Sequence, residues 1–291
     1  MRLSVVVTSY ESPESLRSCL ESLARQPLAE EILVADGSAM DPSTALARFF
    51  PAVRFLHLPD LVTVPRLRWA AFRKSSGDVV AAVEARCVPE QAWCETLLAA
   101  HARHPEAPAI GGPVGIGQLA SSFDLGLYFS EYGLFAPPVA EEPVKRLPGA
   151  NLSYKREALE QASDLLDSGA WETLLHERWV REGRRLFLCP ASVVFRNTMG
   201  RARAILQRFH YGRCYAADRV ARDRAGVRLL FAAASLLLPF LLTARAALRA
   251  LTPWRRRFLR ALPWLAFLNT VWSLGELTGY LTGKPGSPRN F

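Results

Sequence analysis

The chain has 291 residues, half of them hydrophobic, and a formal net charge of +9. This much apolar sequence excludes an intrinsically disordered chain and suffices for one large domain, or for one domain with an appendage. The positive charge is compatible with nucleic acid, an anionic membrane surface or phosphorylated substrates, so the positions of the arginines decide between these partners. Five cysteines form neither a CxxC motif nor a paired framework, and we expect reduced thiols at Cys19, Cys87, Cys94, Cys189 and Cys214.

The amino-terminal residues predict a buried strand followed by an amphipathic helix. Residues 3–8 are a short β-branched run. Ser12 can cap the following helix, and Pro13 suits its first position. Because the strand begins almost at once, with no charged leader and apolar segment ahead of it, we expect the amino-terminal domain to stay in the cytoplasm.

Strands and helices then alternate along the chain. Apolar runs over residues 31–36, 53–58 and 79–83 predict strands, and "VPRLRWAAFRKSSG" and the segment after Pro89 predict helices. This alternation favours an α/β fold with a Rossmann-like, mostly parallel sheet covered by helices on both faces.

Polar residues follow three of these strands, at positions 8–11, 36–38 and 84–86. Ligands bind such sheets beyond the carboxyl ends of the strands, so we expect these segments to form one rim. Each segment alone is compatible with an ordinary turn or solvated loop. An acid-x-acid triplet at a strand end would suggest a divalent metal holding a diphosphate, but the third position of Glu84-Ala85-Arg86 is arginine.

Residues 110–151 are rich in glycine, proline and aromatic residues, which predicts a long irregular binding loop. The segments after it predict two helices, "KREALEQASDLL" and "AWETLLHERWVREG", and a strand, "RRLFLCPASVVF". Glu172 lies at the start of the second helix, where a carboxylate can face the rim.

Five segments, in this order, resemble the inverting family 2 glycosyltransferases of GT-A fold over about residues 3–197. They are "SVVVTSYESPESLRSCLESL", "EILVADGS", "SGDVVAAVEARCVP", "LPGANLSYKREAL" and "WETLLHERWVREGRRLFLCPASVVF". The resemblance implies a GT-A catalytic domain over residues 1–200. It also implies transfer of a sugar from a nucleotide-sugar donor, with a UDP-sugar favoured, to an acceptor hydroxyl with inversion at the anomeric carbon.

The resemblance assigns donor-side roles residue by residue. Glu11 replaces the usual Asn of the first nucleotide loop, and Ala35 replaces one of two aspartates that contact base and ribose. Either Arg66 or Arg68 matches the arginine that precedes the metal-motif strand, and Glu84-Ala85-Arg86 falls on the DxD motif. The nucleotide-sugar-binding residues expected on this basis are Thr8, Ser9, Tyr10, Glu11, Asp36, Arg66, Arg68 and Glu84.

The same resemblance places Glu172 on the catalytic aspartate of the ED motif, with Trp171 where the Glu would be. Gly149, Ala150 and Asn151, with Trp171, are assigned to the acceptor side. Inversion needs a base that takes the acceptor proton as its oxygen attacks C1, and Glu172 is the candidate. The alternative is an ordinary acid at a helix start, favoured by the helix dipole.

Arg86 leaves three interpretations open. A divalent metal, Mg or Mn, usually neutralises the leaving diphosphate. A guanidinium binds diphosphate oxygens in bidentate fashion and stays protonated, so Arg86 can partly replace the metal in catalysis. Alternatively, Glu84 alone holds a weakly bound metal, or Arg86 points away, paired with a loop acid, in a protein that has lost activity.

The arginine excess lies after residue 200, with eight arginines against two aspartates over residues 201–228. Gln207, His210 and Tyr211 resemble the QxxRW motif of membrane glycosyltransferases, which implies an acceptor-side position, with His and Tyr for Arg and Trp. A basic amphipathic connector over residues 201–228 is the alternative.

Two uncharged segments follow, residues 229–244 and 261–275, and both fall short of the roughly 20 apolar residues that a spanning helix needs. Six arginines and no acid lie between them. Two short spans would put those arginines outside, against the positive-inside tendency, so we expect a monotopic, membrane-associated helical hairpin over residues 229–291, on the cytoplasmic face of the cell membrane. A soluble helical pair packed on the domain is the alternative.

This location implies a membrane lipid partner and a membrane-linked acceptor, such as a lipid-linked saccharide or glycolipid. The alternatives are a polysaccharide-chain glycosyltransferase and a catalytically silent membrane scaffold that keeps the GT-A fold. Nucleic acid is not an expected partner, because the arginines cluster beside apolar segments and not among stacking aromatics on a sheet.

Overall fold

The computed structural model describes residues 1–10, 13–60, 63–220 and 225–285. The chain forms two compact units. Unit 1 comprises Met1–Gly115 and Pro137–Thr198, and unit 2 comprises Ile116–Ala136 and Met199–Phe291. The domain ranges predicted from the sequence, 1–200, 201–228 and 229–291, stay predictions. In the structure, residues 116–136 pack with the carboxyl-terminal helices and belong to unit 2.

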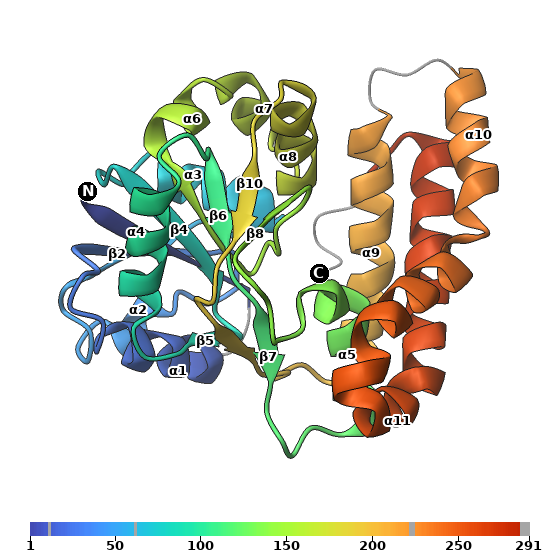
Figure 1. The fold of residues 1–291 in the computed structure, drawn as a ribbon, viewed down its shortest axis with the longest axis horizontal. Helices are drawn as coiled ribbons and strands as arrows, with labels where there is room; N and C mark the ends of the chain where they lie inside the picture. The colour runs from blue at the N-terminus through green and yellow to red at the C-terminus, as the bar shows by residue number, and fades with distance from the viewer. Residues whose placement is uncertain (11–12, 61–62, 221–224, 286–291) are drawn as a thin grey trace. The chain divides into compact units, whose positions relative to one another are not determined.

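Unit 1 is built on an eight-stranded sheet with the order β3-β2-β1-β4-β9-β6-β10-β8 (Figure 1). The pairings β1 with β2, β1 with β4, β2 with β3 and β6 with β10 are parallel, whereas β9 runs antiparallel to β4 and β6, and β8 to β10. The predicted α/β fold with a mostly parallel sheet is confirmed. The strands are β1 (Leu3–Ser9), β2 (Glu31–Asp36), β3 (Val53–His57), β4 (Val79–Glu84), β6 (Ala109–Gly111), β8 (Glu142–Val144), β9 (Asn151–Lys155) and β10 (Leu186–Leu188).

A second, three-stranded sheet has the order β5-β11-β7. It consists of β5 (Cys87–Pro89), β11 (Val193–Phe195) and β7 (Val114–Ile116). β5 follows β4 after two residues, so this small sheet supports the chain beyond the carboxyl end of β4.

Helices surround the sheet of unit 1. Every residue of β1 is buried, so both faces of the sheet are covered at its centre. In α1, the leucines predicted to share one face, Leu16, Leu20 and Leu23, are all buried. The helices of unit 1 are α1 (Pro13–Leu23), α2 (Ser43–Leu46), α3 (Val64–Phe72), α4 (Trp93–Arg103), α6 (Arg156–Glu160), α7 (Ser163–Ser168) and α8 (Glu172–Arg181).

The structure corrects three local predictions. The segment 110–151 is not one irregular loop, because it contains the helix α5 (Ser122–Tyr132), which begins at a capping box between Ser121 and Asp124. "KREALEQASDLL" forms the two short helices α6 and α7, and "RRLFLCPASVVF" forms two strands, β10 and β11. Pro190 lies between these strands and has no N–H for a sheet hydrogen bond, which accounts for the break. The five cysteines are buried and form no disulfide among the described residues.

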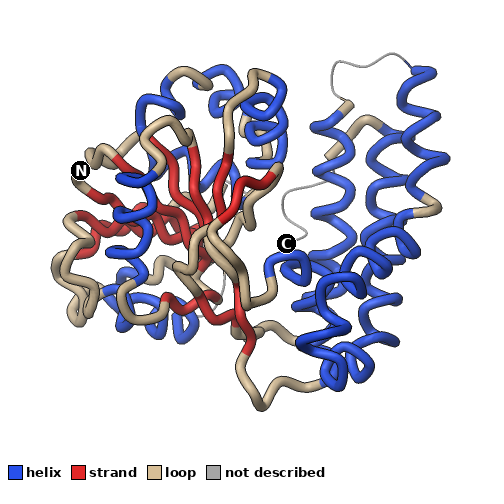
Figure 2. The backbone as a smooth tube through the Cα atoms, viewed as in Figure 1, coloured by secondary structure: helices blue, strands red, loops and turns tan. Residues whose placement is uncertain are grey.

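Unit 2 is helical (Figure 2). Its elements are α5, a short 3-10 turn (Gly133–Phe135), α9 (Arg201–Arg219), α10 (Ala225–Ser235) and α11 (Leu238–Thr282). α9 and α11 pack with their backbones close together, because a methyl group on Gly275 would lie 2.1 Å from the Phe209 carbonyl oxygen and one on Gly279 would lie 2.4 Å from that of Arg213. Glycines therefore set the spacing of these two helices.

The predicted carboxyl-terminal hairpin is not confirmed. The apolar run 229–244 is broken between α10 and α11, which meet at a bend of 57°. α11 then continues through the arginine-rich segment, with non-helical backbone at Trp254 and prolines at 253 and 263. Among the described residues, no single helix has the length and apolar character to cross a membrane; the bent pair 226–235 and 238–250 meets that criterion by length and composition alone.

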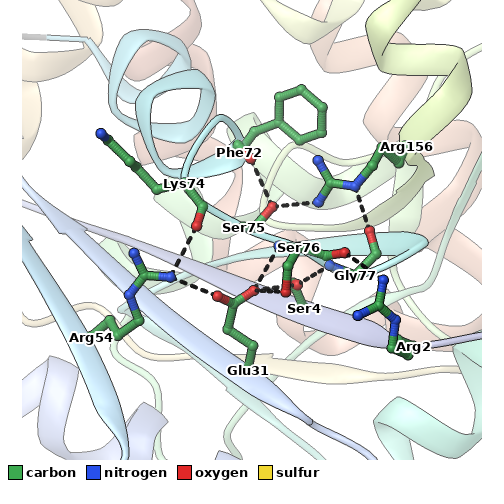
Figure 3. A network of polar contacts seen from close by, with 10 residues as sticks. All are labelled: Arg2, Ser4, Glu31, Arg54, Phe72, Lys74, Ser75, Ser76, Gly77 and Arg156. Carbon is green, nitrogen blue, oxygen red and sulfur yellow. Dashed lines mark hydrogen bonds and ion pairs between the residues drawn. The ribbon is translucent and has the colours of Figure 1, made fainter.

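A polar network lies at the amino ends of β1, β2 and β4 (Figure 3). The Glu31 carboxylate accepts hydrogen bonds from the Ser4 hydroxyl at 2.6 Å, the Ser76 backbone N–H at 2.9 Å and the Arg54 guanidinium at 2.7 Å. Gly77 is required beside it, because a methyl group there would lie 2.6 Å from the Ser4 backbone nitrogen. Partial burial by itself raises the pKa of Glu31, but the hydrogen bonds outweigh it and lower this pKa below its usual value of 4.5.

We expect Glu31→Gln to lower the free energy of unfolding at pH 7 by about 1–3 kcal/mol, the contribution of hydrogen bonds to a charged group. Because the folded-state pKa of Glu31 is lowered, its contribution is present above the unfolded-state pKa and is lost as the pH falls through the folded-state value. Denaturant unfolding from pH 7 to pH 3 measures this. Glu30→Gln, at an exposed neighbouring position, is the matched control. An equal effect of both variants at pH 7 would contradict the assignment.

Candidate functional site

The three polar strand ends predicted to share a rim lie side by side. In the parallel register, Ser9 is opposite Asp36 and Thr8 is opposite Glu84. Thr8, Ser9 and Asp36 are buried, yet Thr8 Oγ1, Ser9 Oγ and Asp36 Oδ2 have no hydrogen-bond partner among the described residues. Buried polar atoms are nearly always paired, so three adjacent ones at the carboxyl edge of a parallel sheet indicate a ligand site.

Local turn chemistry orients Asp36. Its Oδ1 accepts hydrogen bonds from the backbone N–H of Ser38 at 3.0 Å and from the Ser38 hydroxyl. The Ser38 carbonyl lies 2.9 Å from His57 Nε2 at the end of β3. This turn fixes Asp36 Oδ1, whereas Asp36 Oδ2 takes no part in it. Tyr10 follows the strand end, and Glu11 lies outside the described residues, as does the predicted cap Ser12.

The end of β4 carries an ion pair. Arg86 Nε donates to Glu84 Oε2 at 3.0 Å, and the Arg86 side chain is only 7% exposed. Its guanidinium carbon lies 5.2 Å from the centre of the Phe195 ring, and its carbonyl accepts a hydrogen bond from the Arg196 N–H. The Arg86 guanidinium is therefore paired with the Glu84 carboxylate of the same triplet. Contacts with Phe195 in β11 and with Arg196 just after it fix the position of Arg86.

These residues do not fit a metal held by an acid-x-acid pair. Such a site needs carboxylate oxygens turned toward one point, and here the single carboxylate of the triplet, Glu84, is bound by Arg86. No group of three or more His, Cys, Asp or Glu side chains that could hold a metal occurs in the parts of the chain that the structure describes. Glu84, predicted as a metal ligand, therefore belongs to no such group among the described residues.

Glu172 is held by a buried ion pair. Arg68, on α3, is 2% exposed; its Nη1 donates to Glu172 Oε2 at 3.0 Å and its Nη2 donates to the Gly149 carbonyl at 2.7 Å. Burial by itself lowers the pKa of Arg68, but the charge of Glu172 and weaker effects of Tyr154 and Glu84 raise it on balance. Glu172 is the first residue of α8 and is itself buried. Both charges are therefore fixed in position.

Neighbouring contacts fix the approach to α8. The indole Nε1 of Trp69 donates to the Ala170 carbonyl at 3.0 Å, so two consecutive residues of α3 hold the chain on either side of Trp171. Gly149 lies against the other oxygen of Glu172, because a methyl group at Gly149 would stand 2.0 Å from Oε1. The carboxylate is thus enclosed by Arg68 on one oxygen and by glycine backbone on the other.

The structure separates the two candidate arginines. Arg68 is the buried one and donates to Glu172, so in the structure it positions that carboxylate; its predicted contact with the nucleotide stays a prediction. Arg66 is exposed and lies against Gly169, at the end of α7. Its predicted contact with the nucleotide stays a prediction.

Three hydrogen bonds hold the Asn151 side chain, and its predicted acceptor-side role stays a prediction. Its Oδ1 accepts from Trp93 Nε1 at 2.8 Å, and its Nδ2 donates to the carbonyls of Pro113 at 2.9 Å and Ala191 at 2.8 Å. The amide is fully buried and ties β9 to two loops. Ala150 is also fully buried, whereas Trp171 is partly exposed beside Glu172.

Sequence reasoning missed two buried residues behind Glu172. His176 lies one helical turn further along α8; it is fully buried, and neither ring nitrogen has a hydrogen-bond partner among the described residues. Burial, then the charges of Arg68 and Arg146, lowers the pKa of His176 to about 3, so the ring is neutral. The ring of Tyr154 lies 6.2 Å from it. The i, i+4 spacing of Glu172 and His176 was the available signal.

Gln207, His210 and Tyr211 share one stretch of α9 in unit 2. Gln207 Nε2 donates to the Tyr211 hydroxyl at 3.2 Å, and His210 is buried. Burial, then the charge of Arg213, lowers the pKa of His210. The acceptor-side role that the resemblance implied for these three residues stays a prediction.

Comparisons with known proteins identify the family. Residues 4–161, more than half of the chain, match the family described as Glycosyl transferase family 2. The chain belongs to this family. The resemblance stated from the sequence is thereby confirmed at the level of the family.

A curated relative, the N-acetylglucosaminyltransferase of Rhizobium sp. (strain N33), is 32% identical to this family 2 chain over 128 residues. The match covers 41% of this chain and only 27% of the relative's length.

Solved structures share the fold of this family 2 chain. The mannosyltransferase PcManGT from Pyrobaculum calidifontis, in complex with GDP-Man and Mn2+, has a TM-score of 0.59 at 17% identity, and the match covers 95% of this chain and 87% of that one. TarS from S. aureus, in complex with UDP-GlcNAc, has a TM-score of 0.53 at 12% identity, covering 93% and 91%. At these identities the comparison supports the GT-A-like fold alone.

We expect Gly149→Ala to abolish most turnover without unfolding the protein. The added methyl group displaces the end of the Glu172 side chain, so Glu172 loses its position against Arg68, and the disturbed ion pair also lowers stability. A displacement of about 1 Å lowers the rate of nucleotide-sugar turnover by about 100-fold. Gly115→Ala is the matched control, because its methyl group meets nothing closer than 3.7 Å. Equal turnover by both variants would contradict the importance of this contact.

Proposed function

We propose that this family 2 chain is an inverting glycosyltransferase that moves a sugar from a nucleoside-diphosphate donor to a hydroxyl of a membrane-linked acceptor. The observation that carries the proposal is the buried Glu172 carboxylate, fixed by Arg68 and Gly149 in the same unit as the unpaired strand-end groups. A carboxylate held in one orientation is what a general base requires.

The reaction assigns a role to each group. Glu172 takes the proton of the acceptor hydroxyl while that oxygen forms a bond to C1 of the sugar. The bond from C1 to the diphosphate oxygen breaks on the opposite face, and its electron pair leaves with the nucleoside diphosphate. Attack opposite to the leaving group inverts the configuration at C1.

The strand ends are assigned to the nucleotide. Thr8 and Ser9 offer hydroxyl donors, and Asp36 Oδ2 is an acceptor for a base N–H or a ribose hydroxyl. The solved structures with GDP-Man and UDP-GlcNAc support a nucleotide sugar as donor, and we propose a UDP-sugar first.

We further propose that unit 2 holds the enzyme on the cytoplasmic face of the cell membrane as a monotopic anchor. Large apolar side chains are exposed at the bend between α10 and α11, including Phe240 at 75%, and further along α11 at Leu248, which is 84% exposed. Arginines on α11, among them Arg245 and Arg249, are exposed beside them. Apolar side chains next to cations fit the interface of an anionic bilayer. A lipid-linked saccharide or glycolipid is the acceptor that this location favours.

We expect Glu172→Gln to lower sugar transfer by about 100- to 10,000-fold, because the amide cannot take a proton. Its oxygen still accepts the hydrogen bond from Arg68, so we expect UDP to bind as it does to the wild type. The transfer rate is measured with a panel of UDP- and GDP-sugars and membrane lipid extract, and UDP binding is measured by calorimetry.

Glu177→Gln, on the same helix in an exposed pair with Arg146, is the matched control for that experiment. Full transfer by Glu172→Gln would show that another group is the base. If the wild type turned over no nucleotide sugar with lipid or polysaccharide acceptors, the catalytically silent scaffold would replace the proposed function.

We expect the triple variant Leu236→Ser, Leu237→Ser, Phe240→Ser to bind anionic vesicles at least about 10-fold more weakly, since each side chain loses its apolar burial in lipid. Cosedimentation with vesicles of phosphatidylserine and phosphatidylcholine measures this, and added salt should weaken binding further. Leu28→Ser, an exposed leucine of unit 1, is the control. Unchanged vesicle binding, or self-association through this face without lipid, would contradict the anchor.

A further inference from the structure

The departing nucleoside diphosphate places a demand on the end of β4. As the bond to C1 breaks, negative charge grows on the diphosphate oxygen, and a fixed positive charge close to it lowers the barrier. Glycosyl transfer of the proposed kind therefore needs a cation near the strand ends at Thr8 and Glu84, which are adjacent in the sheet register.

Two carboxylates near this strand end have a guanidinium partner. Arg86 pairs with Glu84, and Arg68 pairs with Glu172. A dication binding at Glu84 would stand beside the positive charge of Arg86. A second acidic side chain in the triplet would favour a divalent metal here, whereas the positive charge of Arg86 in that position disfavours one.

Arg86 is held as a fixed cation. Its side chain is buried and packs over the Phe195 ring, and its backbone belongs to the turn between β4 and β5, where β5 pairs with β11. Glu84 takes the Nε–H, and the guanidinium keeps its charge at every accessible pH. A guanidinium on a rigid support matches the bidentate geometry of phosphate oxygens.

We infer that Arg86 supplies the positive charge for the donor diphosphate, with Glu84 orienting its guanidinium, and that no metal is held at this triplet. This inference rests on the proposed function. When the C1–O bond breaks, the electron pair stays on the diphosphate oxygen, which accepts hydrogen bonds from the Arg86 guanidinium. The acceptor proton goes to Glu172, and Arg86 stays protonated throughout.

Calorimetry with UDP and GDP tests this inference on the full chain, in EDTA and in MnCl2. For the wild type we expect the same Kd in both buffers. Arg86→Ala should bind at least about 10-fold more weakly in EDTA, the loss of a charge-assisted contact. Arg86→Asp creates an acid-x-acid triplet, and its binding should become at least about 10-fold tighter with Mn2+ than with EDTA. Glu84→Gln keeps the cation and should still bind in EDTA.

Arg103→Ala is the control, because Arg103 forms an exposed pair with Glu141 in the same unit. Thermal unfolding establishes that each variant is folded, and Arg86→Gln replaces Arg86→Ala if the alanine variant is not. Wild-type binding that is lost in EDTA and restored by Mn2+ would overturn the role of Arg86 and leave the proposed function intact. Binding of neither nucleotide under any condition would overturn the proposed function, and this inference with it.

Discussion

The arrangement of this site depends on the buried ion pair between Arg68 and Glu172. Removing two charges from water is costly, and the attraction between them offsets that cost only when the geometry is good and further hydrogen bonds are made. Here Arg68 also donates to Gly149, so one guanidinium joins α3, the loop before β9 and the start of α8. A carboxylate held this way has one orientation. A general base requires this, whereas an acid that only solvates the protein surface does not.

The polar groups at the two ends of the parallel strands differ in how completely they are hydrogen-bonded. At the amino end, both oxygens of Glu31 are bonded by Ser4, Ser76 and Arg54, and this network joins three strands. At the carboxyl end, Thr8, Ser9 and Asp36 retain buried polar atoms without a partner among the described residues. A saturated network stabilises a fold, whereas an unsaturated one is stable only where a ligand or water completes it. This asymmetry supports the assignment of the nucleotide to the carboxyl end.

Unit 2 combines close helix packing with an exposed apolar surface. Glycines let α9 and α11 approach backbone to backbone, while Leu229 and Leu230 on α10 and Phe240 at the start of α11 remain exposed. An exposed apolar surface beside arginines is unfavourable in water and favourable at an anionic bilayer. The proposed anchor therefore accounts for the exposed apolar side chains and for the arginines next to them. An acceptor that also resides in the membrane would meet the enzyme there.

The sequence by itself determined the strands of the parallel sheet, the rim at their carboxyl ends and the family, because apolar runs and the order of short motifs are local properties. It did not reveal α5 inside the glycine-rich segment, although the spacing of Ser121 and Asp124 was a local signal for it. Only the tertiary structure decided that Arg68 and not Arg66 contacts Glu172, and that Arg86 lies on Glu84. Partners 104 residues apart, as Arg68 and Glu172 are, are chosen by packing, and no sequence spacing encodes which of two nearby arginines is turned inward.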